Sequence, residues 1–209
     1  MYTKLKATLK TVLPLPLVNL LKLLRNWSDM RVSLAFVQDA TLPLSWGERA
    51  NIIKQLYWTS LNLNSPHTQA EILAFIRAML ALPADTPGVI VEAGCFKGSS
   101  SAKFSLAAEM VGRDFVIFDS FQGIPLNDEP HDKNIFGAGA SFNQGDYCGS
   151  LDEVKSNVQK FGRIHCCRFV PGWLEETLPH FEEPVSAAYL DVDLVSSTRT
   201  CPANKRCFE

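Results

Sequence analysis

Apolar residues in the first third of the chain recur at helical spacing, whereas from about residue 85 short apolar runs alternate with helical stretches. A leucine stripe over residues 17–24 and capping boxes at residues 45–48 and 68–71 predict successive helices. We therefore expect a helical N-terminal segment over residues 1–64. Its predicted role is to cover the substrate side as a lid or to mediate dimerisation.

The remainder, residues 65–209, is expected to form a second unit in which strands and helices alternate. Strands are predicted at 89–91, 115–118, 168–170 and 187–190, and helices at 99–110, 151–161 and around 174–178, with a long loop over 122–149. Such alternation predicts an α/β fold: a Rossmann-like, mostly parallel sheet, wound right-handedly with helices on both faces.

Charge and composition narrow the possible partners. The 209 residues carry 20 Lys and Arg against 22 Asp and Glu, and 46% of them are hydrophobic, which predicts a globular protein without affinity for nucleic acid. No uncharged apolar stretch approaches the ~18 residues of a membrane span. Pro14 and Pro16 interrupt the apolar run that could imitate a signal peptide, so we expect a cytoplasmic protein with reduced cysteines.

A glycine-containing turn follows the first predicted strand. Gly94 permits a sharp turn, Gly98 allows a ligand to approach, and Ser99 opens the helix whose free N–H groups face that ligand. Because the glycines are spaced Gly-x-x-x-Gly, and no Gly-Lys-Ser/Thr is present, a pyrophosphate is not the expected ligand. Glu92 instead suits a cationic amino group. A turn required only for tight packing would give the same pattern.

Asp119 ends the second predicted strand, 21 residues beyond Gly98. In nucleotide-binding α/β folds, a carboxylate at this place accepts hydrogen bonds from ribose hydroxyls. Together with Glu92 and Gly94, it predicts a site for an adenosine joined to an amino acid, which is S-adenosylmethionine. An NAD-dependent oxidoreductase is the competing enzyme class, and the glycine spacing argues against it.

Asp191 and Asp193 stand at the carboxyl end of the last predicted strand, on one side of the chain. Two carboxylates at this sheet edge suit Mg²⁺, which would lower the pKa of a substrate hydroxyl while a carboxylate takes the proton. A solvated pair that caps the next turn is the alternative. The four histidines, at positions 67, 131, 165 and 180, have no motif partner.

Six ordered motifs resemble those of the macrocin O-methyltransferase (TylF/MycF/NovP-like) family of class I S-adenosylmethionine-dependent methyltransferases. They are EAGCFKG (92–98), FDSFQGIP (118–125), LDEV (151–154), FVPGW (169–173), TLP (177–179) and LDVDLVSST (190–198). The resemblance implies that Glu92, Gly94 and Gly98 line the methionine side, that Asp119 binds ribose and that Ser120 lies near adenine. Asp191 would be metal ligand and base, with Asp193 as a supporting carboxylate.

The implied activity is Mg²⁺-assisted methylation of a hydroxyl on a sugar or small natural-product glycoside, and a homodimer is a further expectation. The sequence departs from the family at Val195, where tyrosine is usual, and it ends at Glu209, before further strands and metal ligands that the family has. We therefore expect a C-terminally truncated sheet and weak Mg²⁺ binding. The alternative is a non-catalytic remnant that binds only the cofactor or a protein partner.

Overall fold

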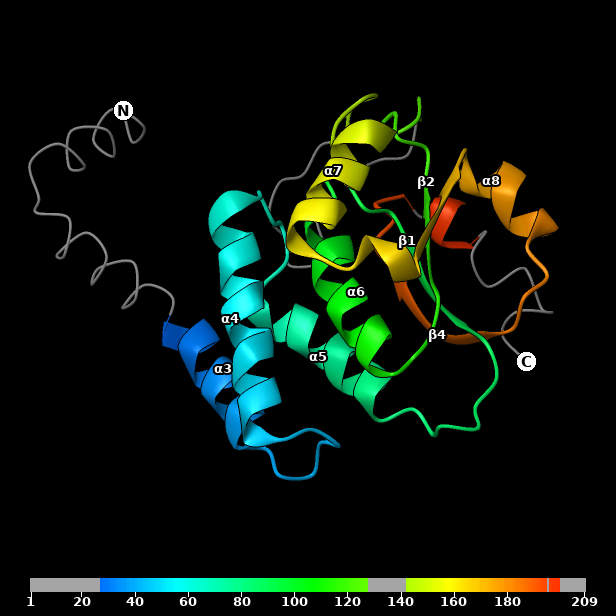
Figure 1. Cartoon of the computed structure of the whole chain (residues 1–209). Helices are drawn as coiled ribbons and strands as arrows, with labels where there is room; N and C mark the ends of the chain where they lie inside the picture. Colours follow the sequence, from blue (N-terminus) through cyan, green and yellow to red (C-terminus); the bar gives the residue numbers. More distant parts are fainter. Residues whose placement is uncertain (1–26, 128–141, 195, 200–209) are drawn as a thin grey trace, which may run out of the picture.

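A computed structural model describes residues 27–127, 142–194 and 196–199 (Figure 1). Its helices are α3 (Trp27–Gln38), α4 (Trp46–Asn62), α5 (Gln69–Leu80), α6 (Ser99–Met110), α7 (Leu151–Phe161) and α8 (Leu174–Thr177), with short 3₁₀ turns η1 (Ile164–Cys166) and η2 (Leu178–His180). The strands are β1 (Val89–Ala93), β2 (Phe115–Asp119), β3 (Cys167–Pro171) and β4 (Val185–Leu190). The leucine stripe, His131 and Val195 lie outside the described residues.

The four strands form one parallel sheet in the order β3-β2-β1-β4, which confirms the predicted α/β architecture. From β1 the chain builds β2 and β3 on one side and then returns to place β4 on the other. In the register, Ala93 pairs with both Phe118 and Leu190, so three strands end at nearly the same level. The strand order reverses at β1, and ligands of open α/β sheets bind at such a switch point.

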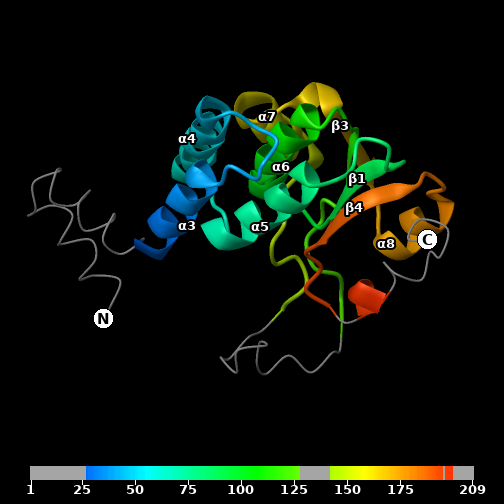
Figure 2. The same cartoon turned by 90° about the horizontal axis from the view of Figure 1, so that it is seen from below.

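Helices cover both faces of the sheet, as predicted, but unequally (Figures 1 and 2). On one face, α5, α6 and α7 pack over a large apolar core, which α3 and α4 extend through Phe36, Ile52 and Leu56. On the other face, α8 and η2 contribute Leu174 and Leu178 to a smaller cluster. The N-terminal helices thus share a continuous core with the helices of the sheet.

The capping boxes in the sequence predicted the starts of α4 and α5 correctly. Both capping boxes form, because the Ser45 and Thr68 side chains accept from the backbone N–H three residues on while the glutamate there accepts from the cap's own N–H. The helix predicted around 174–178 is shorter than expected: α8 ends at Thr177, and a 3₁₀ turn containing Pro179 follows. Proline has no N–H to continue an α-helical ladder, which accounts for the change.

The described residues contain four of the six cysteines, and all four are free thiols. Cys95, in the turn that follows β1, is buried, and Cys148 is exposed. Among the helices of the described ranges, none combines the length and the apolar character that crossing a bilayer requires.

Candidate active site

The turn after β1 brings three strand ends together at Gly94. Its φ of +84° lies in the left-handed region, and a Cβ here would come within 2.1 Å of the Asp191 carbonyl oxygen. The Gly94 N–H donates to the Phe118 carbonyl at 2.9 Å, and the Asp191 N–H donates to the Ala93 carbonyl at 2.9 Å. Glycine is required at this position because the chain leaving β4 passes directly against it. The hydrogen bond from the Asp191 N–H to the Ala93 carbonyl holds Asp191 next to the turn.

Gly98 has a reason to be glycine within the packing of the protein itself. It is the N-cap of α6 with a φ of +76°, and a Cβ would lie 2.9 Å from Cγ1 of Val154 on α7. The close approach of α7 and the left-handed backbone therefore explain this residue. Neither Gly98 nor Ser99 lines the cavity described below.

Asp119 joins the two turns at the ends of β1 and β2. Its Oδ2 accepts from the Cys95 N–H and its Oδ1 accepts from the Phe121 N–H, both at 2.7 Å. These bonds fix the carboxylate at the mouth of the turn. Because each carboxylate oxygen can accept a second hydrogen bond, the group keeps acceptor capacity on the side that faces the cavity.

Glu92 is fully buried on β1 and does not line the cavity. Burial raises the pKa of its carboxyl to about 8, although the Ser101 hydroxyl donates a hydrogen bond to Oε2. The other oxygen, Oε1, and the buried hydroxyl of Ser99 have no hydrogen-bond partner among the described residues. Two unsatisfied polar atoms thus lie directly behind the turn, which is uncommon for buried groups.

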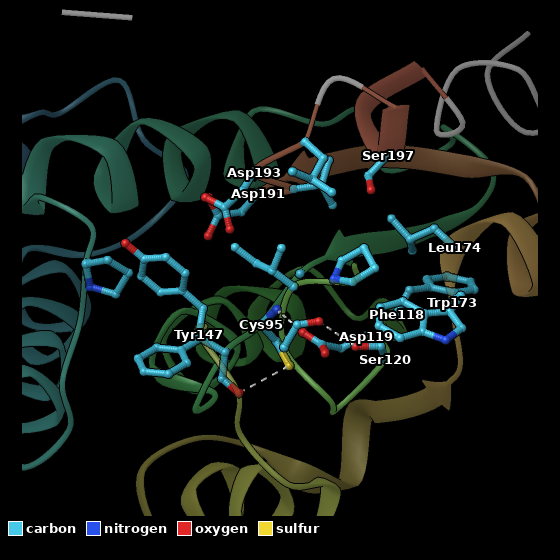
Figure 3. A pocket seen from close by; sticks show the side chains of 18 of the residues that line it. Cys95, Phe118, Asp119, Ser120, Tyr147, Trp173, Leu174, Asp191, Asp193 and Ser197 are labelled. Atoms are coloured by element: carbon cyan, nitrogen blue, oxygen red, sulfur yellow. Dashed lines mark hydrogen bonds between the residues drawn. The ribbon is translucent and has the colours of Figure 1, made fainter. Parts of the chain in front are cut away.

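A cavity of about 310 Å³ opens at the carboxyl ends of β1, β2 and β4 (Figure 3). Five of the eight predicted site residues line it: Gly94, Asp119, Ser120, Asp191 and Asp193. The remaining three, Glu92, Gly98 and Ser99, lie behind it. In Figure 3, Asp191 and Asp193 face Tyr147 at one end, while Ser120, Trp173 and Leu174 gather at the other.

His67 is a site residue that sequence reasoning missed. It precedes the N-cap of α5, lines the cavity, and lies with Nε2 3.1 Å from Oδ2 of Asp191 and Nδ1 3.2 Å from the hydroxyl of Tyr189. Burial alone would lower the pKa of His67, but the hydrogen bond and charge of Asp191, with the carboxylates of Glu92 and Glu71, raise it. Burial also raises the pKa of Tyr189, so its phenol remains a hydrogen-bond donor.

These contacts fix the arrangement of protons in the neutral imidazole. The Tyr189 hydroxyl donates to Nδ1, and the protonated Nε2 donates to Asp191. His67 is more than 120 positions from both partners along the chain, and no spacing rule connects them. The only local signal was its place beside the Thr68 capping box, at the end of α5 that meets the carboxyl edge of the sheet.

Two aromatic side chains complete the walls of the cavity. Trp173 lines the end that contains Ser120. Tyr147 has a φ of +55° and packs edge-to-face on Phe96, with ring centroids 5.8 Å apart. Non-glycine residues rarely adopt this backbone region, and they do so mainly at turns and functional sites.

Solved structures share the fold. The calicheamicin methyltransferase CalS11 superposes with a TM-score of 0.51 and 21% identity, over 86% of this chain and 72% of its own. The O-methyltransferase NovP superposes with a TM-score of 0.51 and 22% identity, over 67% of this chain and 62% of its own.

Sequence comparisons agree with the structural likeness. A Streptomyces olivaceus protein, 8-demethyl-8-(2,3-dimethoxy-alpha-L-rhamnosyl)-tetracenomycin-C 4'-O-methyltransferase, is 30% identical in an alignment of 120 residues that covers 54% of this chain and 45% of the relative. The chain thus spans about 45% of the length of this curated relative. The model of the macrocin O-methyltransferase (TylF) family matches residues 74–203, a range that includes the seven strands and α-helices from β1 to β4 and ends beyond Asp193. The chain belongs to the macrocin O-methyltransferase family.

Proposed function

We propose that the protein transfers a methyl group from S-adenosylmethionine to a hydroxyl of a sugar or small natural-product glycoside. The observation that carries this proposal is the cavity at the switch point. Asp119 and Asp191, which follow strands on opposite sides of β1, both line this cavity. The Streptomyces olivaceus relative is named for O-methylation of a rhamnosyl tetracenomycin, which supports a sugar acceptor.

The end of the cavity with Ser120 and Trp173 suits the nucleoside of the methyl donor. Asp119 is held by two backbone N–H groups and would accept from the ribose hydroxyls with its remaining lone pairs. Ser120, whose hydroxyl donates to the Gly123 carbonyl at 3.2 Å, would lie near the adenine. The turn at Gly94, with the unsatisfied Glu92 Oε1 behind it, fits the methionine portion and its cationic amino group. The predicted contacts of Gly98 and Ser99 remain predictions.

When bound, S-adenosylmethionine supplies an electrophilic methyl group on a sulfonium. At the other end of the cavity, Asp191 is the proposed proton acceptor, with Asp193 as a supporting carboxylate. Asp191 would take the proton of the acceptor hydroxyl as the oxygen gains the methyl group and the bond from that methyl group to the donor's sulfur breaks. His67 donates to Oδ2 of Asp191 and so leaves Oδ1 for that proton. His67 is therefore a positioning residue.

Mg²⁺ assistance, with Asp191 as its ligand, was expected from the sequence, but the described residues do not form such a site. They contain no group of three His, Cys, Asp or Glu side chains that could hold a metal ion, and His67 occupies one oxygen of Asp191. We therefore assign no step to a metal. The Mg²⁺ requirement stays a prediction, and loss of turnover in EDTA that Mg²⁺ restores would support it.

The roles expected for the N-terminal segment also stay predictions. A lid or a homodimer contact over residues 1–64 would suit α3 and α4, which carry the exposed side chains Leu34, Trp46 and Trp58. Analytical ultracentrifugation tests the homodimer.

Calorimetric titration with S-adenosylhomocysteine, followed by an assay of methyl transfer to a panel of glycosides, tests the proposal. Micromolar binding with turnover supports the methyltransferase. Binding without turnover supports the alternative of a non-catalytic protein that holds the cofactor or a protein partner, and no binding refutes the assigned cavity.

A further inference from the structure

Two adjacent cysteines, Cys166 and Cys167, lie where the 3₁₀ turn η1 meets the edge strand β3. Successive side chains of an extended strand point to opposite faces, which would separate two neighbouring thiols. Because Cys166 still belongs to the turn, both side chains instead reach the same atom. The two Sγ atoms donate to the Arg163 carbonyl oxygen, at 3.1 and 3.2 Å. The fold therefore holds the two thiols on one side of the chain.

The surroundings of the pair keep the two sulfurs in place. Both side chains are half-buried and pack against the larger apolar core. Ser105 on α6 contacts the same segment twice: its carbonyl accepts from the Cys166 Sγ at 3.6 Å, and its hydroxyl accepts from the Arg163 N–H at 2.9 Å. These contacts hold the connection between α7 and β3 against α6, while the incomplete burial leaves the thiols open to a small reagent.

The two thiols differ in acidity. A hydrogen bond between the two side chains lowers the pKa of Cys166 and raises that of Cys167, although burial and the charge of Glu109 act against the shift at Cys166. The direction of the two shifts means that the Cys167 thiol donates to the Cys166 sulfur. Because the thiolate is the reactive form of cysteine, Cys166 is the nucleophile of the pair and Cys167 remains protonated beside it.

The charges beside the pair bear on which oxidant it meets. Glu109 acts on the charge of Cys166, and the same carboxylate pairs with Arg163 at 2.7 Å and with His165 at 2.9 Å. Because Glu109 holds these two basic side chains, they do not offer their charge to an anionic oxidant such as glutathione disulfide. Hydrogen peroxide is small and uncharged, so it reaches a half-buried sulfur without electrostatic attraction.

We propose that Cys166 and Cys167 are a vicinal dithiol that hydrogen peroxide oxidises to an internal disulfide. The Cys166 thiolate attacks one peroxide oxygen, the O–O bond breaks, and the sulfur becomes a sulfenic acid while the other oxygen takes up a proton and leaves as water. The Cys167 sulfur then attacks the sulfenic sulfur, the S–O bond breaks, and the Cys167 proton leaves with the hydroxide as a second water. Two thiols are thus oxidised by two electrons, and one peroxide is reduced to two waters.

This site is separate from the cavity of the proposed function. Cys167 begins β3 at the amino edge of the sheet, where it pairs with the first residue of β2, whereas the cavity opens at the carboxyl ends of the strands. Neither cysteine lines that cavity. Failure of S-adenosylhomocysteine to bind would refute the proposed function and leave this inference unaffected.

Tryptic mass mapping of wild type tests the proposal, because cleavage after Arg163 and Arg168 releases both cysteines in one peptide, residues 164–168. The protein is treated with hydrogen peroxide for increasing times, alkylated with iodoacetamide in urea and digested. We expect this peptide to become about 2 Da lighter and to resist alkylation until dithiothreitol is added. Its thiols should be lost at least about fivefold faster than that of Cys148, the matched control, which is exposed and has no adjacent cysteine.

Two variants separate the roles of the two thiols. Cys167→Ser should stop the reaction at the Cys166 sulfenic acid, which dimedone traps. Cys166→Ser should slow the loss of the Cys167 thiol at least about fivefold, and an unchanged rate would contradict the assigned nucleophile.

Peroxide treatment of wild type in concentrated urea needs no variant and separates the folded geometry from mere adjacency in sequence. Unfolding should abolish the advantage of the pair over Cys148, because the contacts with Ser105 and Arg163 are lost. An advantage of the same size in urea, oxidation no faster than that of Cys148 in the folded protein, or disulfides to Cys201 or Cys207 in place of the internal one would each overturn the proposal.

Discussion

Replacement of Glu92 by glutamine should change how the stability of the ligand-free protein depends on pH. This side chain is fully buried on the central strand, and burial raises the pKa of its carboxyl from 4.5 to about 8. Glutamine has nearly the same shape and can still accept the hydrogen bond from Ser101, but it carries no charge at any pH.

Proton linkage gives the sign and the size of the effect. A carboxyl with a higher pKa in the folded than in the unfolded protein stabilises the fold fully below the unfolded pKa, and this contribution is lost as the pH rises through the folded pKa. Between the unfolded pKa of 4.5 and the folded pKa of about 8, each pH unit costs about 1.4 kcal/mol. The wild type should therefore lose about 3 kcal/mol relative to Glu92→Gln between pH 5 and pH 7.

Urea denaturation followed by tryptophan fluorescence at several pH values measures this difference, and urea adds no ionic screening. The hydrogen bonds of the introduced glutamine do not depend on pH. Their contribution therefore cancels when the stability difference between wild type and Glu92→Gln at one pH is compared with the difference at another pH. Glu176→Gln, on the exposed surface of α8, is the control and should show no such trend. A stability difference between wild type and Glu92→Gln that is the same at pH 5 and pH 7 would refute the assigned burial of this charge.

Three further substitutions address the site and its frame. Asp119→Asn should weaken binding of S-adenosylhomocysteine by about 1–3 kcal/mol in calorimetry, because a charged acceptor is lost, and an unchanged affinity would count against the ribose contact. His67→Gln should lower kcat by about tenfold to a hundredfold without changing the affinity for S-adenosylhomocysteine. A kcat equal to that of wild type would contradict the positioning role of His67. Gly98→Ala should destabilise the fold by about 1–3 kcal/mol in urea, because φ is +76° and the new Cβ meets Val154. Gly112→Ala, at φ +64° with open space around it, separates the backbone cost from the packing cost, and equal losses for both variants would contradict the packing argument.

Much of the fold was readable from local patterns. The helix over Leu151–Phe161 was predicted with its observed bounds, and the strands differ from prediction by one or two residues at their ends. The observed strands are longer because β1 and β2 each pair with a strand on both sides. The hydrogen bonds between two strands continue for as long as both strands remain extended. Such extension depends on neighbours in the sheet, so periodicity along one segment does not reveal it.

The site was only partly readable. The positions of Asp119 and Asp191 follow from strand ends, and parallel strands deliver their carboxyl ends to one edge, so both residues were expected at the cavity. Gly98 was assigned to ligand approach, whereas Val154 on α7 occupies the space beside it. A glycine in a turn has the same sequence signature for either reason.

The sequence by itself determined the order and type of the elements, the parallel sheet and the carboxylates at its edge, since each of these depends on spacing within one segment and on general rules of chain direction. Tertiary structure alone decided that His67 meets Asp191, that Glu92 is buried behind the turn and that Glu71 lines the cavity. These outcomes depend on how α5 and α6 pack against the sheet, and contacts between segments far apart along the chain leave no periodic trace in the sequence.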